Sequence, residues 1–162
     1  MNRYAIPAGA LLALAVLATP ATAQDAPDLT GAWSLSAEAS DFGRSPAPDS
    51  ATMMIERADD RLVMRRDLYS ERAGGHRYYT FDMPTDGGFY PAMTVDGEQE
   101  MQVLWDEGAL VVVTEAQANV GPVEVRDRFR LDDGGQQLVI DRVVDVPGMG
   151  AMEMTIVYDR LN

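Results

Sequence analysis

The chain contains no cysteine and a single histidine, His76, among its 162 residues. Without cysteine there is no disulfide, no thiolate nucleophile and no cysteine-ligated metal site. One histidine excludes histidine-rich metal sites and weakens any histidine-based catalytic triad. The acidic turns match no calcium-loop spacing, and no glycine-rich phosphate loop is present. We therefore expect no metal, no other cofactor and no catalytic residues.

Lysine is also absent, so arginine supplies all 13 basic residues against 26 acidic ones, and the net charge is −13. A charge of this sign disfavours nucleic acid and anionic membranes as partners. We interpret the negative charge as a determinant of solubility, and we expect no nucleic-acid partner.

The first 23 residues have the pattern of a secretory signal peptide. Arg3 precedes an apolar run from Ala8 to Ala18, and Ala21-Thr22-Ala23 forms a small-x-small cleavage signal before Gln24. The run is shorter than the roughly 20 residues of a membrane span, and no cysteine follows that could carry a lipid. We expect a periplasmic or secreted protein with one domain, residues 24–162, and no membrane insertion after cleavage.

The remaining sequence predicts about nine or ten short strands separated by turns. Apolar and polar residues alternate most clearly in the last three strands, whose apolar sets are Val123, Val125, Phe129 and Leu131; Leu138, Ile140 and Val144; and Met152, Met154, Ile156 and Tyr158. Consecutive strands with one apolar face predict an all-β, antiparallel up-and-down β-barrel, which leaves no exposed sheet edge.

Gly31 and Trp33, in the first expected strand, resemble the Gly-x-Trp motif of the lipocalins and the wider calycin group. Ser40-Asp41-Phe42-Gly43 and Pro46-Ala47-Pro48 resemble a family of small secreted bacterial proteins, lipocalin-like and mostly uncharacterised. The resemblance implies a lipocalin-like barrel that binds small hydrophobic molecules in its interior. It also implies that Arg160 packs over Trp33 and closes one end.

Two charged residues, Asp127 and Arg142, occupy positions on apolar faces. A register with Val125 opposite Arg142 would make Asp127 a diagonal neighbour of Arg142 and would place Arg126 opposite Asp141 on the outer face. Buried charges must be paired. The pair is therefore either a polar anchor inside a ligand cavity or an internal ion pair that fixes the register.

Tyr78 and Met154 complete the candidate ligand-binding residues of the interior. The segment from His76 to Phe81 is rich in aromatics, which could either line a pocket or fill the barrel. In the first case His76 is a candidate acid or base; in the second it is a residue at the edge of a turn. Methionines such as Met154 suit a cavity and an ordinary core equally.

The closed end predicts a single mouth at the opposite end. We expect the turns at 106–108 and 147–149 to lie at the mouth and the turn at 132–133 to lie at the closed end.

The sequence is compatible with three functions. The first is an exported barrel that binds a small apolar or amphipathic ligand, which a cavity of about 300 Å³ or more would favour. The second is a cell-envelope interaction or maintenance protein with a filled core, and the third, which we favour least, is an enzyme.

Overall fold

The computed structural model describes residues 26–119, 121–132 and 134–161, so the expected signal peptide lies outside the described residues. The described chain forms ten strands: β1 (Gly31–Leu35), β2 (Ser50–Ala58), β3 (Arg61–Ser70), β4 (Gly75–Pro84), β5 (Phe89–Thr94), β6 (Gly97–Asp106), β7 (Ala109–Ala118), β8 (Gly121–Leu131), β9 (Gln137–Val146) and β10 (Gly150–Arg160). In this part of the chain no helix is long and apolar enough to cross a membrane.

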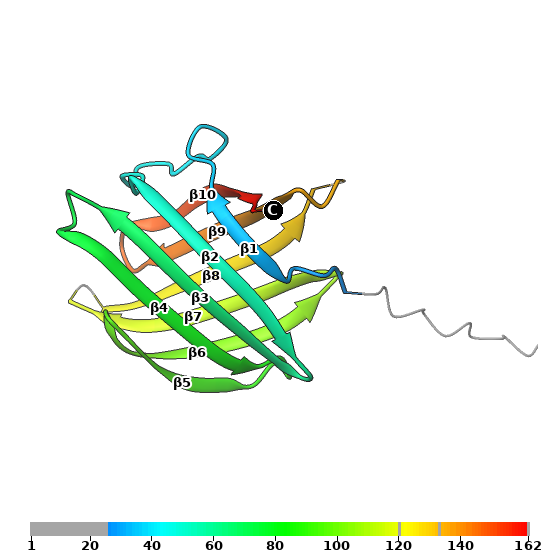
Figure 1. The fold of residues 1–162 in the computed structure, drawn as a ribbon. Helices are drawn as coiled ribbons and strands as arrows, with labels where there is room; N and C mark the ends of the chain where they lie inside the picture. Colours follow the sequence, from blue (N-terminus) through cyan, green and yellow to red (C-terminus); the bar gives the residue numbers. More distant parts are fainter. Residues whose placement is uncertain (1–25, 120, 133, 162) are drawn as a thin grey trace, which may run out of the picture.

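All ten strands belong to one antiparallel sheet in the order β4-β3-β2-β1-β10-β9-β8-β7-β6-β5. Sequence neighbours pair with each other, and β1 pairs with β10, so the sheet curls into the predicted up-and-down barrel (Figure 1). The two ends of this order, β4 and β5, share no ladder among the described residues. The barrel is therefore nearly closed, with one gap that the prediction of a closed barrel did not include.

Side chains link the two sides of this gap. Asp96, in the turn between β5 and β6, accepts hydrogen bonds from Arg77 Nη1 at 2.9 Å and from the Tyr79 hydroxyl at 2.8 Å. Both donors lie on β4, so the contact holds the two sheet edges together where no backbone ladder does. We call these three residues the Asp96 link.

The strands follow the alternation of the sequence. In β2 every second residue from Ala51 to Ile55 is buried, because successive side chains of a strand point to opposite faces. β7 differs, since all of Ala109–Val113 is buried. Two of its outward residues, Val111 and Val113, lie opposite Arg128 and Arg126 of β8, whose aliphatic stems can cover apolar neighbours.

Consecutive turns of an up-and-down barrel alternate between its two ends. The turns at 59–60, 85–88, 107–108 and 132–136 therefore lie at the end where β1 begins and β10 finishes. The turn at 147–149 lies at the opposite end, as expected. The placement of 106–108 with it was wrong, because only one hairpin separates that turn from 132–136.

The segment from 36 to 49 connects β1 to β2 without a helix and is fixed to β10. The Ser40 hydroxyl accepts a hydrogen bond from Val157 N at 2.9 Å and donates one to Ser36 O at 2.7 Å. Asp41 pairs with Thr155 through both backbone groups. The Ser-Asp-Phe-Gly motif thus continues the pairing along β10 beyond the end of β1.

Candidate ligand-binding site

Asp127 and Arg142 form a two-pronged ion pair on the inner face of the barrel. Arg142 Nε and Nη2 each lie 2.6 Å from one carboxylate oxygen of Asp127. The side chain of Asp127 is 9% exposed and that of Arg142 is 23% exposed. Burial lowers the pKa of Arg142, but the adjacent Asp127 carboxylate, through its charge and hydrogen bonds, outweighs this effect and the net shift is upward. The Arg142 guanidinium is therefore charged beside Asp127 on the inner face of the barrel.

The pair is closer than the sequence register implied. Asp127 lies directly opposite Arg142, and Val125 lies opposite Val144. The shift arises in the β8–β9 turn, where one carboxylate oxygen of Asp132 accepts the backbone N–H groups of both Gln136 and Gln137. This hydrogen bonding keeps Gln136 in the turn, and the ladder begins with the next residues.

The same shift overturns the predicted outer pair of Arg126 and Asp141. Arg128, rather than Arg126, lies opposite Asp141. The ion pair with Asp141 is made by Arg130, whose Nε lies 2.9 Å from the carboxylate. Arg126 lies 3.5 Å from Glu124 on its own strand.

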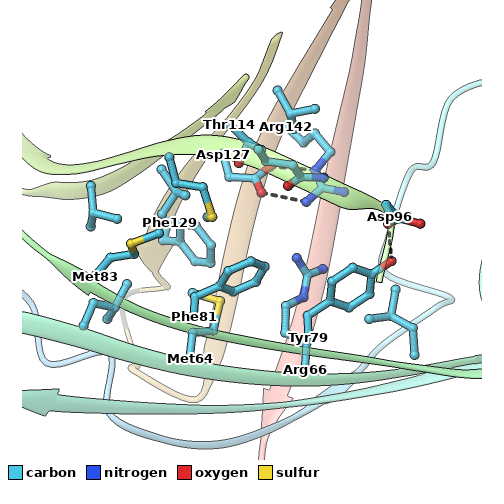
Figure 2. A pocket seen from close by; sticks show the side chains of 17 residues that line it. Met64, Arg66, Tyr79, Phe81, Met83, Asp96, Thr114, Asp127, Phe129 and Arg142 are labelled. Carbon is cyan, nitrogen blue, oxygen red and sulfur yellow. Dashed lines mark hydrogen bonds and ion pairs between the residues drawn. The ribbon is translucent and has the colours of Figure 1, made fainter. Parts of the chain in front are cut away.

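A cavity of about 210 Å³ lies beside the ion pair (Figure 2). Its walls come from β3, β4, the β5–β6 turn and strands β6 to β9, and the lining residues are Leu62, Met64, Arg66, Leu68, Tyr79, Phe81, Met83, Asp96, Gln99, Met101, Val103, Val112, Thr114, Val125, Asp127, Phe129 and Arg142. Aliphatic, methionine and phenylalanine side chains form most of the wall. The cavity does not reach the ~300 Å³ that we expected of a ligand-binding barrel and at which drug-sized ligand sites begin, so it has room only for a compact ligand.

Two of the predicted interior residues do not line this cavity. Tyr78 is 63% exposed on the outer face, so the prediction that it lies in the interior was wrong. Its neighbours Tyr79 and Phe81 line the cavity instead. Both alternating sets of this segment contain aromatic residues, and the pairing of Tyr79 with the inward Arg66 of β3 selects the inner set. Met154 lies opposite Arg142 and packs against the core outside the cavity.

Sequence reasoning missed Arg66, the other cation of the cavity wall. In Figure 2 its guanidinium extends from β3 toward the space between Phe81 and the Asp127–Arg142 pair. Its Nε is buried and has no hydrogen-bond partner among the described residues. Its Nη2 reaches the Tyr158 hydroxyl only at 3.5 Å, near the outer limit of a hydrogen bond. A signal for Arg66 was present, since it continues the alternation of Leu62 and Met64.

His76 lies on the outer face, away from the cavity. Its Nδ1 is 2.9 Å from Asp67 Oδ1, and its ring stacks on Tyr78 with a centroid separation of 5.7 Å. Asp67 is thus a carboxylate partner of His76, but neither residue is among those that line the cavity.

Trp33 and Arg160 meet at the end of the barrel where the chain enters. The guanidinium carbon of Arg160 lies 4.2 Å from the Trp33 ring centroid, inside the ~6 Å range of a cation–π contact. Arg160 also donates from Nε to Gly135 O and from Nη1 to Thr30 O. A Cβ on Gly31 would lie 2.9 Å from Arg160 Nη1, so the missing side chain leaves room for the guanidinium.

Two members of the Asp96 link, Tyr79 and Asp96, line the cavity. Burial, followed by the hydrogen bond to the Asp96 carboxylate, raises the pKa of the Tyr79 hydroxyl above its ordinary value. At neutral pH the hydroxyl therefore keeps its proton and donates a hydrogen bond to Asp96. In the described residues no group of three acidic or histidine side chains is arranged to hold a metal ion.

No protein-family model matches the chain, and no curated protein matches its sequence. Solved structures do match in fold. A zebrafish ileal bile acid-binding protein in complex with cholic acid aligns over 82% of this chain and 98% of its own, with a TM-score of 0.56 and 15% identity. This chain has a calycin-type barrel fold.

Two further structures give the same fold. A Schistosoma mansoni fatty acid binding protein in complex with arachidonic acid has a TM-score of 0.53 at 16% identity, over 82% of this chain and 96% of its own. A mutant of the fluorescent protein UnaG has a TM-score of 0.59 at 16% identity, over 83% and 96%. At these identities the likeness is one of fold.

Proposed function

We propose that this protein binds a small amphipathic ligand in the interior of its barrel. The observation that carries the proposal is the cavity itself, whose walls are mainly apolar and whose charged groups converge from β3, β8 and β9. Ligand sites commonly combine an apolar wall with a few placed polar groups. The bile acid-binding and fatty acid binding neighbours, which share the fold, support the same class of ligand.

The volume limits the ligand. At about 210 Å³ the cavity is compact, and Trp33, Met53 and Tyr158, whose side chains are fully buried, are not among the residues that line it. A ligand would therefore occupy the part of the interior between β3–β4 and β6–β9. This favours a short or compact apolar body over a long extended chain.

Binding of 1-aminoanthracene, a neutral fluorescent probe, tests the proposal. Val125 lines the cavity, so Val125→Trp should fill it and weaken binding about tenfold or more, by steric exclusion. Val143, opposite the exposed Arg126, lies on the outer face of β9, so Val143→Trp is the matched control and should bind as the parent protein does. If the parent does not bind the probe, or both variants bind alike, the filled-core interaction protein is the better description.

Export is a separate part of the proposal. It rests on Arg3, the apolar run and Ala21-Thr22-Ala23. Mass spectrometry of the protein isolated from cells that produce it should show an N-terminus at Gln24. A chain that retains Met1 would contradict export by this signal.

A further inference from the structure

We propose that Arg66 binds the negative charge of the ligand, so that the protein selects singly charged anionic amphiphiles with a compact apolar body. This inference rests on the proposed function and names the class of ligand. It starts from the charges in the cavity wall, which belong to Arg66, Asp96, Asp127 and Arg142.

Three of these four charges already have partners. Both oxygens of Asp127 are used by Arg142, at 2.6 Å each. Asp96 is held by Arg77 and Tyr79 of the Asp96 link. The wall therefore contains two neutralised pairs and one further cation, Arg66.

Arg66 has no such charged partner in the part of the chain that the structure describes. An arginine stays protonated in proteins, so it cannot escape burial by losing its charge. The Nε atom of Arg66 is buried without a hydrogen-bond acceptor among the described residues. Its Nη2 atom has only a long hydrogen bond, 3.5 Å, to the Tyr158 hydroxyl. Arg66 is only partly buried, so the cost of its missing counter-ion is smaller than for a fully buried charge, and an anionic ligand group would remove it.

The geometry suits one small anionic group. Arg66 extends into the cavity beside Phe81, and the Asp127–Arg142 pair lies on the other side of that space (Figure 2). A guanidinium offers several donors in a planar fork that matches a carboxylate. The apolar body would then lie among Met64, Met83 and Phe129.

Calorimetry with octanoate and octanamide tests the inference, because the two compounds match in size and differ in charge. The parent protein should bind octanoate about tenfold to a hundredfold more tightly than octanamide, as expected for a hydrogen bond to a charged group. Arg66→Gln should abolish that preference and leave octanamide binding unchanged. Arg66→Lys should restore part of it.

Arg65→Gln is the matched control, since Arg65 is the adjacent arginine, half-exposed and paired with Glu56 on the outer face. It should keep the full preference for octanoate. Because the comparison of the two compounds is made within each protein, a general loss of stability does not imitate the effect. The parent protein alone provides a test that needs no variant.

Equal affinity of the parent for octanoate and octanamide would overturn the inference, and so would a preference that survives Arg66→Gln. If 1-aminoanthracene still binds in that case, the proposed function stands without the anionic specificity. If none of the three compounds binds the parent protein, the proposed function and the inference both fail.

Discussion

Strands β6 to β9 carry charged residues in different arrangements on the inner and the outer face of the barrel. On the inner face Asp127 meets Arg142 in a two-pronged pair. On the outer face four carboxylates stand in one row, each directly opposite the next across the strands: Glu100, Glu115, Glu124 and Asp145. The outer row is tolerated because water screens the repulsion between its carboxylates and because Arg126 lies 3.5 Å from one of them, Glu124. Inside the barrel, where water is largely excluded, a charge needs a direct partner, as Asp127 and Arg142 provide for each other.

The largest effect should come from breaking the inner pair. Asp127→Ala would strand the Arg142 guanidinium in the interior and should lower the free energy of unfolding by about 3 kcal/mol. Urea denaturation measures this change. The double variant Asp127→Leu with Arg142→Met should cost less than the single one, because it removes both charges. A single variant as stable as the parent would show that water reaches the pair.

A third inner cation, Arg160, is satisfied by two carbonyl oxygens and the Trp33 ring, with no carboxylate partner among the residues that the structure describes. Gly31→Ala should displace it and strain a backbone with φ of +130°, at a cost of about 1–3 kcal/mol. Gly75→Ala is the control, since its φ is +115° but a Cβ there would meet nothing within 4 Å. The difference between the two melting temperatures isolates the collision with Arg160, and equal losses would contradict it.

The outer row should respond in the opposite direction. Glu115 has a carboxylate on each side, Glu100 and Glu124, so Glu115→Gln should stabilise the protein by about 0.5–1 kcal/mol at low salt. The gain should shrink at high salt, where the repulsion is already screened. Glu38→Gln, in the exposed segment between β1 and β2, should show neither effect. A loss of stability in Glu115→Gln would mean that the row is compensated.

Alternation along the strands explains how much of this the sequence could predict. It gives the barrel class and identifies Asp127 and Arg142, because each interrupts an apolar set. Applied to β3 it also identifies Arg66, which follows Leu62 and Met64 in the same set. Here the information was in the sequence.

Other features depend on contacts that alternation does not describe. Tyr78 and Tyr79 both belong to plausible inward sets, and only the pairing with β3 decides between them. The β8–β9 register depends on the Asp132 carboxylate bonding two backbone N–H groups. The gap between β4 and β5 depends on how far the curled sheet brings its two edges together, which no local pattern records.

The Asp96 link lies where the inner face reaches solvent, so removing one of its hydrogen bonds should change the free energy of unfolding less than the changes above. The Tyr79 hydroxyl donates to Asp96, and Tyr79→Phe should lower the free energy of unfolding by about 0.5 kcal/mol at pH 8. The pKa of Tyr79 is raised from an ordinary value of 10.0, first by burial and then by the Asp96 carboxylate. A raised pKa means that the stabilisation is complete below pH 10 and is lost as the pH rises through the folded-state value. The difference between the parent and Tyr79→Phe, measured by urea denaturation, should therefore decrease above pH 10. Subtracting the two proteins removes the other tyrosines, which titrate in both. A difference that stays constant up to pH 11 would show that the hydroxyl does not donate to Asp96 in solution, and that the edges of β4 and β5 are held together by other contacts.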